Sequence, residues 1–589
     1  MNNTNGALQT VASLFNFKRD GEAQRSDVGV SLEKLVIETQ EDLADLRVVK
    51  KRQDIVGNAT LAAKVSVVEV EGGGFAILTH PEYRKAHVVD EVARRVQKLS
   101  RGSEVKIYTI APLMLLSLNK TSDENLLGSR KKHTTYEVAF ESVIEFAIAN
   151  KASDITFNVY KDKEDSQIFF QIDGMYVAPR LWRLPTARME EILSIVWQAV
   201  KGGSESFFSG NEEQQGKVET FAYGKKVMLR WSSIATDRGP SVTFRALIQE
   251  EVKDIEFYGY LPSHLAMFVR NQASGGGIIG IAGRVGMGKT SSTASLLNRL
   301  PRFWKIISIE DPVEIELPHV IQCTVENRLD GSKNASYVSK LFSLKRNAPN
   351  AVSLGEIRDK LTGEGVIEVG GMGTQLYLTV HALGMVQIPE RLASKSIQIP
   401  RDFLASPGML KLLVYQILVP KLCECALDIT EFEDFGGNDA TGVFREASYW
   451  TAYLERLDRI FQVDSRTLKV RNTDGCECCR NEHFTELNGF RGRDQIAEMM
   501  EPNAHYKILE CIASGDTLGL QSYLNTLPRS RIDDENMDNK TIIECGMYKA
   551  LKGSIDPRDI ELATESFETV ERLPRYANLK SEVIKHERA

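Results

Sequence analysis

The chain has 589 residues, of which 42% are hydrophobic and 26% are charged, the balance of a globular protein. A single hydrophobic core rarely extends beyond about 250–300 residues, so this length predicts three or four domains. Because 73 Lys and Arg face 80 Asp and Glu, the net charge is −7, which argues against a protein whose main task is to bind nucleic acid.

Two uncharged stretches fail as membrane or export segments. Residues 369–389 contain no Asp, Glu, Lys or Arg, but their four glycines, two glutamines and His381 make a lipid-facing helix unfavourable. Residues 1–17 are also uncharged, yet they lack the basic start of a secretory signal. The sequence therefore predicts a cytoplasmic protein.

Residues 1–130 have the pattern of a small α+β domain. Apolar alternation at 64–70 indicates a strand, and the charge pattern at 88–99 indicates a helix. Apolar residues between Ala7 and Phe15 are spaced like one helix face, which fits either a frayed terminus or a partner-binding helix.

A second α+β domain is predicted over residues 135–250. It begins with an amphipathic helix at 136–150 and continues with strands at 167–171 and 227–231. Asp173-Gly174 follows the first of these strands and is a signal for a hairpin turn.

Residues 260–505 have the pattern of an α/β domain. Apolar strands predicted at 278–282, 306–309, 352–354 and 376–380 alternate with helical stretches, as a parallel sheet with crossover helices requires. A polar insertion at 421–493 interrupts this domain, and residues 506–589 form a charged, helical tail.

A phosphate-binding loop follows the first of these strands. The segment matches G-x-x-x-x-G-K-[ST] and lies between an apolar strand and a helical run, which makes a chance match a poor explanation. In such loops, backbone N–H groups surround the phosphates, the lysine contacts the β- and γ-phosphates and the hydroxyl binds Mg²⁺. The predicted nucleotide-binding residues are Gly283, Arg284, Val285, Gly286, Met287, Gly288, Lys289, Thr290 and Ser291.

Carboxylates and a histidine end the next strands. Glu310, Asp311 and Glu314 lie close together, which suits either a Mg²⁺-assisted hydrolytic site or a solvated acidic turn. Glu356 ends an apolar strand, where a Walker B acid belongs, and His381 ends another. A single histidine at a strand end is more often structural, but three such strand ends after one phosphate loop favour a common site.

Together these motifs resemble the ATPases of type II secretion and type IV pilus assembly, a branch of the secretion superfamily of hexameric ATPases. The match includes the phosphate loop and residues 309–314, 355–359 and 378–381. Further similarities lie at 152–155, 171–174, 229–231, 243–245 and 489–493. The match covers about residues 136–500. The resemblance implies a RecA-like ATPase domain preceded by α+β domains, the second of them PAS-like, with a cysteine zinc-binding insertion and a helical C-terminal tail.

The resemblance also implies roles for single residues. Thr290 and Glu356 would bind Mg²⁺, Glu314 would polarise the attacking water, and His381 would contact the γ-phosphate. Arg230 and Arg245 would act as arginine fingers, unless they form ordinary surface salt bridges. One departure from the family pattern stands before the Walker B strand, where Ala348-Pro349-Asn350 replaces the usual Asp-Pro-Asp.

Five of the eight cysteines lie in two tight groups, which in a reducing compartment suggests a metal rather than disulfides. The family has two C-x-x-C pairs, whereas the first pair here, Cys423 and Cys425, is one residue shorter. The predicted zinc ligands are Cys423, Cys425, Cys476 and Cys479, with Cys478 or His483 as substitutes for Cys425, against the alternative of reduced thiols without metal.

The predicted function is a cytoplasmic hexameric ATPase, with ATP, Mg²⁺ and zinc as cofactors. It would drive assembly of a type IV pilus or a type II pseudopilus, and it would be bound peripherally at the inner membrane. An inner-membrane platform protein and an adaptor on residues 1–130 would be its partners, without nucleic acid. The alternatives are a RecA-like translocase for DNA transfer and a non-catalytic scaffold.

Overall fold

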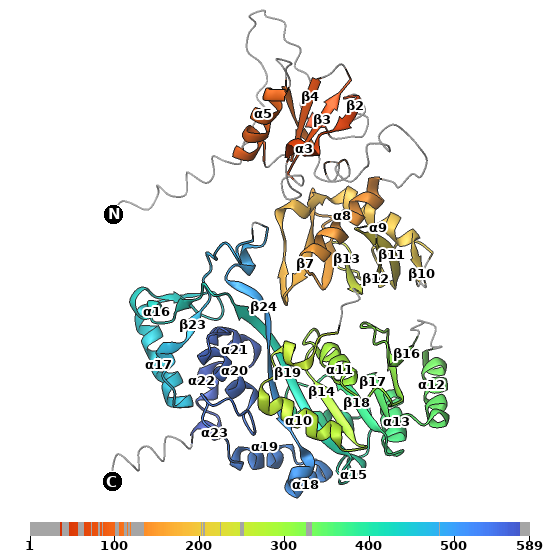
Figure 1. Ribbon diagram of the computed structural model, residues 1–589, viewed down its shortest axis with the longest axis vertical. Helices are drawn as coiled ribbons and strands as arrows, with labels where there is room; N and C mark the ends of the chain where they lie inside the picture. Colours follow the sequence, from red (N-terminus) through yellow and green to blue (C-terminus); the bar gives the residue numbers. More distant parts are fainter. Residues whose placement is uncertain are drawn as a thin grey trace, which may run out of the picture. The chain divides into compact units, whose positions relative to one another are not determined.

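The computed structural model (Figure 1) describes residues 36–37, 46–56, 64–71, 74–80, 83–84, 86–99, 105–110, 115, 118, 135–201, 203, 206–223, 225–247, 252–325, 333–481 and 483–577. The chain divides into two compact units, Met1–Lys132 and His133–Ala589. The apolar spacing between Ala7 and Phe15 lies outside the described residues. In the described part of the chain, none of the helices combines the length and the apolarity that a membrane crossing requires.

The first unit contains a mixed sheet with the strand order β1-β5-β4-β3-β2. Helix α5 (His87–Leu99) packs on it through Val89, Val92 and Val96, which are buried together with Val67. The other elements are β1 (Val36–Ile37), β2 (Val48–Lys51), α3 (Gln53–Val56), β3 (Val65–Val70), β4 (Gly74–Thr79) and β5 (Val105–Ile110).

The second unit begins with helix α8 (Thr135–Ala149) and an antiparallel sheet with the order β10-β11-β12-β13-β6-β7-β8, in which β9 also pairs with β7. Aromatic side chains fill its core, where Trp231 and Phe244 are buried with ring centroids 4.9 Å apart. The elements are β6 (Asp154–Asn158), β7 (Asp165–Ile172), β8 (Met175–Val177), η2 (Arg180–Trp182), β9 (Arg183–Pro185), α9 (Thr186–Gln198), β10 (Val200–Lys201), β11 (Gln215–Ala222), β12 (Lys225–Ile234) and β13 (Ser241–Leu247).

The turn predicted at Asp173-Gly174 joins β7 to β8, and both residues have positive φ, 50° and 85°. That geometry belongs to the tight turns that suit the twist of hairpin strands. We call residues 135–247 the arginine domain, because its strands carry Arg230 and Arg245.

The α/β part that follows has a sheet with the order β16-β15-β17-β18-β14-β19-β24, in which β14 to β19 pair in parallel and β24 is antiparallel. The predicted strands are confirmed as β14, β15, β17 and β18, and this part of the chain has an α/β fold. The elements are η3 (Ile255–Tyr258), α10 (Pro262–Ala273), β14 (Ile278–Ala282), α11 (Lys289–Asn298), β15 (Ile306–Glu310), β16 (Ile321–Thr324), α12 (Lys333–Asn347), β17 (Ala351–Glu356), α13 (Lys360–Gly370), β18 (Gln375–Val380), η4 (Met385–Gln387), α14 (Ile388–Ala393), α15 (Arg401–Leu404), β19 (Leu410–Leu422) and β24 (Phe490–Met500).

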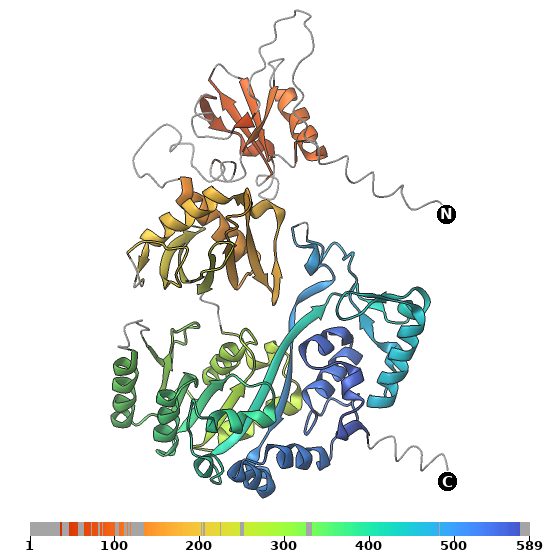
Figure 2. The ribbon, with the colours of Figure 1, turned by 180° about the vertical axis from the view of Figure 1, so that it is seen from behind.

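The long strands β19 and β24 continue beyond this sheet to the cysteine insertion (Figure 2), and helices of the C-terminal part cover them. Helix α20 packs on β24 and α21 on β19. The elements are β20 (Leu427–Asp428), α16 (Glu431–Phe435), β21 (Gly437–Asn438), β22 (Phe444–Arg445), α17 (Ala447–Phe461), η5 (Ser465–Thr467), β23 (Lys469–Val470), η6 (Thr485–Leu487), η7 (Pro502–Ala504), α18 (Tyr506–Ser514), α19 (Thr517–Thr526), α20 (Ile542–Leu551), α21 (Pro557–Ala563), α22 (Phe567–Val570) and α23 (Pro574–Ala577).

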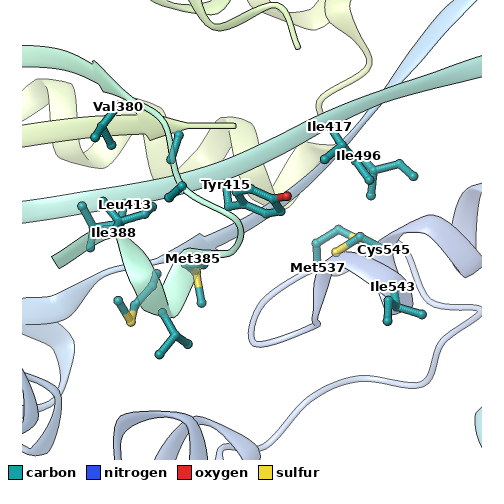
Figure 3. Close-up of a cluster of buried hydrophobic side chains, with 14 of the residues drawn as sticks. Val380, Met385, Ile388, Leu413, Tyr415, Ile417, Ile496, Met537, Ile543 and Cys545 are labelled. Carbon is teal, nitrogen blue, oxygen red and sulfur yellow. The ribbon is translucent and has the colours of Figure 1, made fainter. Parts of the chain in front are cut away.

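One hydrophobic core joins the seven-stranded sheet to these helices. Figure 3 shows Tyr415 and Ile417 of β19 near Ile496 of β24, with Ile543 and Cys545 of α20 beyond them, and all five are buried. Helix α17 of the insertion also contributes Tyr453 and Phe461 to contacts with Phe567 of α22, so the C-terminal helices share this core.

Glu498 of β24 is half-buried beside this core, and its carboxylate accepts a hydrogen bond from the Ile542 backbone N–H at 3.3 Å. Burial raises its pKa from 4.5 to about 7. The folded state therefore holds a proton that the unfolded state releases, so stability is lost as the pH rises from 4.5 to 7 and is constant above that range. Compared with Glu498→Gln, the wild type is expected to lose about 3 kcal/mol of unfolding free energy over this window.

Denaturant unfolding of both proteins between pH 5 and pH 8 measures this difference. Glu565→Gln, a change of an exposed carboxylate in the C-terminal helical part, is the control and should follow the wild type at every pH. A constant difference between Glu498→Gln and the wild type across the range would contradict the raised pKa of Glu498.

Candidate functional site

The phosphate loop connects the buried strand β14 to helix α11, which begins at Lys289. Gly286 and Gly288 have φ values of 76° and 72°, in the region that glycine adopts without strain. At Gly283 a side chain is excluded, because a Cβ would lie 2.5 Å from the Gln416 carbonyl oxygen of β19. The glycines of the motif thus fold the backbone around a space in front of the helix N-terminus.

Lys289, His381 and Glu356 form a hydrogen-bonded chain across the ends of the neighbouring strands. Lys289 Nζ lies 3.2 Å from His381 Nδ1, and His381 Nε2 lies 3.0 Å from Glu356 Oε1. A histidine protonated at Nε2 satisfies both contacts, because it donates to Glu356 and accepts from Lys289. Lys289 also donates to the carbonyl oxygens of Gly283 and Arg284, both at 2.9 Å.

The charge of Lys289 depends on its surroundings. Burial lowers its pKa to about 8, and the carboxylates of Glu356 and Glu314 oppose this effect. A phosphate group beside the ammonium would add negative charge and favour its charged form. The site therefore suits an anion of high charge.

The carboxylates after β15 have different surroundings. Glu310 accepts hydrogen bonds from Ser308 at 2.5 Å and Gln322 at 3.1 Å, and burial raises its pKa. Asp311 is held by Arg358 at 2.7 Å. Glu314 lines the same cavity as Glu356.

Arg230 of β12 and Arg245 of β13 are directly opposite each other in the antiparallel ladder. Like charges in this relation are destabilising unless an anion lies between or beside them. The positive charge of Arg245 is partly balanced by Asp154, because Arg245 Nε donates a hydrogen bond to Asp154 Oδ1 at 2.8 Å. A sequence pattern cannot reveal this opposition, because it depends on the register of two strands.

A cavity of about 630 Å³ brings these groups together, a volume suited to a nucleotide. Gly283 and Arg284 do not line it, but their carbonyl groups hold Lys289. Arg493 of β24 does line it and donates to the Gly286 carbonyl at 3.1 Å, a position that sequence reasoning did not assign to the site. The predicted residues on its wall are Arg230, Arg245, Val285, Gly286, Met287, Gly288, Lys289, Thr290, Ser291, Glu314, Glu356 and His381.

The four predicted zinc ligands meet in the insertion. The sulfurs of Cys423, Cys425, Cys476 and Cys479 all lie within 4.8 Å of one another, and three of these separations are 3.6–3.7 Å. Four thiolates about 2.3 Å from a tetrahedral zinc ion are about 3.8 Å apart, so the group fits this metal. Cys425 belongs to the cluster, whereas Cys478 is exposed and lies outside it.

The thiols in this cluster titrate unequally. Hydrogen bonding from the Cys478 backbone N–H holds the pKa of Cys476 at about 6, whereas burial raises that of Cys425 to about 12. Several thiolates at this spacing repel one another, and a divalent cation removes that repulsion.

Comparison with known proteins decides the family. The profile described as "Type II/IV secretion system protein" matches residues 129–537. The chain belongs to this family. Within the family, it is 26% identical to the type IV pilus assembly ATPase PilB of Thermus thermophilus over 70% of this chain and 41% of that protein. It is 28% identical to type II secretion system protein E of Klebsiella pneumoniae over 57% of this chain and 63% of that protein.

Solved structures of ATPases also match the chain, at lower sequence identity. The Legionella pneumophila ATPase DotB is 17% identical, with a TM-score of 0.47, and the match covers 74% of this chain and 97% of DotB. The chain spans only 41% to 63% of the length of PilB and of protein E from K. pneumoniae, so the activities and partners of those whole proteins do not transfer directly.

Proposed function

We propose that this secretion-family chain is a motor ATPase that powers assembly of a type IV pilus or a type II secretion pseudopilus. The observation that carries the proposal is the single cavity in which the phosphate loop, Glu314, Glu356 and His381 face the paired Arg230 and Arg245. Such an arrangement provides cations and positioned carboxylates for phosphoryl transfer to water.

The residues divide the chemistry of ATP hydrolysis among them. Lys289 and the loop N–H groups bind the β- and γ-phosphates, while Thr290 and Glu356 would hold Mg²⁺, which neutralises phosphate charge when bound. Glu314 accepts a proton from the attacking water. The water oxygen bonds to the γ-phosphorus, and the bond between the γ-phosphorus and the β,γ-bridging oxygen breaks. Arg230 and Arg245 stabilise the charge that develops on the transferred group, and His381 contacts the γ-phosphate.

The proposal includes an assembly and a location. The family resemblance supports a homohexamer in the cytoplasm, bound at the inner membrane through a platform protein. The first unit, Met1–Lys132, would bind an adaptor.

Lys289→Ala is expected to lower the rate of phosphate release by about 10²–10³-fold, because the buried ammonium is the main cation of the loop. Phosphate release and binding of a fluorescent ATP analogue measure the effect. Lys395→Ala, which removes an exposed lysine outside the cavity, should behave as the wild type. Unchanged hydrolysis in Lys289→Ala would favour a scaffold, and strong stimulation of the wild type by DNA would favour a translocase.

We also propose that the cysteine cluster binds structural zinc. Purified protein is expected to contain about one zinc per chain, and Cys476→Ser with Cys479→Ser should lose the metal and unfold the insertion at lower temperature. Elemental analysis and thermal unfolding measure both effects. Cys478→Ser is the matched control, since its thiol is exposed and lies outside the cluster. Less than half an equivalent of zinc in the wild type would contradict the site.

A further inference from the structure

The loop between Cys479 and Gly489 is closed at both ends by the cysteine cluster. Cys479 Sγ accepts a hydrogen bond from the Gly489 backbone N–H at 3.3 Å. The Gly489 carbonyl accepts one from the Cys423 backbone N–H at 2.9 Å. Because a thiolate accepts hydrogen bonds more strongly than a thiol, metal binding at Cys479 would tighten this closure.

Two asparagines hold the interior of the loop. Asn481 Oδ1 accepts hydrogen bonds from the backbone N–H groups of His483 at 2.9 Å and Phe484 at 3.2 Å. Asn488 Oδ1 in turn accepts one from the Asn481 backbone N–H at 2.8 Å. The position of Phe484 is therefore set by side chains of the loop as well as by its closed ends.

The side chain of Phe484 projects from the cysteine insertion and packs in the arginine domain. Its side chain is 0% exposed, and its ring centroid lies 5.7 Å from that of Phe146 in α8 and 6.3 Å from that of Phe170 in β7. Trp182 contacts both of these phenylalanines, and His483 adds an edge contact to Phe146 at 5.7 Å. A residue of the metal insertion thus completes an aromatic cluster that otherwise belongs to the arginine domain.

The contact of Phe484 with β7 is connected to Arg230 and Arg245 through the strands of one sheet. Strand β7 pairs with β6, β6 pairs with β13, and β13 pairs with β12, so the strand that contacts Phe484 belongs to the same sheet as Arg230 and Arg245. Sheets and packed cores move as rigid bodies, so an anchor at β7 restrains where both guanidinium groups lie over the cavity.

We propose that the cysteine cluster and its loop act as a clasp that docks the arginine domain on the motor, with Phe484 as a positioning residue for Arg230 and Arg245. This inference rests on the proposed zinc site and ATPase function, but the docking itself needs no hydrolysis. Within the arginine domain, the clasp packs against the aromatic cluster of Phe146, Phe170 and Trp182.

Photocrosslinking in the full-length, zinc-loaded chain tests the docking. With p-benzoylphenylalanine in place of Phe484, the expected crosslinks fall on peptides 135–149 and 165–172. The same group in place of Phe435, which is 80% exposed on the insertion, should not label these peptides. Zinc removal by a chelator, and separately Asn481→Ala, should each reduce the yield at least threefold, while Lys289→Ala should leave it unchanged. Absence of the crosslink, or a yield that neither treatment lowers, would overturn the proposal.

Kinetics test the positioning role. Phe484→Ala is expected to lower kcat about tenfold with a KM for ATP within twofold, since a small displacement of catalytic groups has effects of this order. Phe484→Leu should restore most of the loss, and Phe435→Ala should have none. In a protein that already carries Arg230→Ala and Arg245→Ala, Phe484→Ala should add less than twofold, because its effect acts through the arginines. A full tenfold loss in that background, or no loss in the wild-type background, would overturn the role.

Discussion

Arg230→Ala is expected to lower kcat for ATP hydrolysis by about 10³-fold, with a much smaller effect on nucleotide binding. An arginine that meets the charge of a transferring phosphoryl group contributes about 10³–10⁵ in rate, whereas its contribution to the ground state is modest. Arg245→Ala should be comparable, and because the two residues are directly opposite in the ladder, their combined loss should be less than the product of the single losses. Steady-state phosphate release and titration with a fluorescent ATP analogue separate the two effects.

Arg238→Ala is the matched control for this prediction. Arg238 lies between β12 and β13, pairs with Asp162 at 2.9 Å and does not line the cavity. Its removal should change kcat by less than about twofold, as expected for an exposed ion pair. Equal effects of Arg238→Ala and Arg230→Ala would show that the arginines only stabilise the sheet, and would contradict their role in hydrolysis.

Glu314→Gln should reduce kcat by about 10²–10⁴-fold and leave ATP bound, because an amide cannot accept the proton of the attacking water. The substitution keeps the size of the side chain and one oxygen acceptor. The protein should therefore fold normally and form a complex with intact ATP that survives for minutes. Single-turnover hydrolysis of radiolabelled ATP measures the chemical step directly.

Glu316→Gln provides the comparison for Glu314→Gln. Glu316 is two residues further along the same segment, is exposed and does not line the cavity. It should hydrolyse ATP at the wild-type rate. If Glu314→Gln were equally active, another carboxylate of the cavity, such as Glu310 or Glu356, would have to orient the water.

Local patterns of the sequence were sufficient to predict the strands and the phosphate loop of the α/β domain, residues 260–505. The strands at 278–282 and 376–380 were predicted because buried parallel strands are continuous apolar runs, and the structure has them as β14 and β18. The phosphate loop and the acidic and histidine strand ends were identifiable for a similar reason. Parallel strands place their carboxyl ends at one edge, so residues that end such strands converge in space whatever the details of packing.

Contacts between segments that are far apart in the sequence could not be predicted from local patterns. The register that sets Arg230 against Arg245 comes from the pairing of two strands, and a shift of one residue would turn either side chain to the other face. The place of Arg493 on the cavity wall comes from the antiparallel return of β24 beside β19. Neither relation leaves a periodic signal in the amino-acid sequence.

The composition, the phosphate loop and the cysteine spacing were enough to indicate an α/β ATPase with a metal insertion, since each is a local property of the chain. The sequence did not indicate that Phe484 docks into the arginine domain, because a single phenylalanine in a polar loop resembles any exposed aromatic residue. It is buried through contacts with Phe146 and Phe170, more than 300 residues away along the chain, as shown by the ring contacts. Burial of this kind is a property of the folded surface that a residue meets, and that surface exists only after both domains have formed.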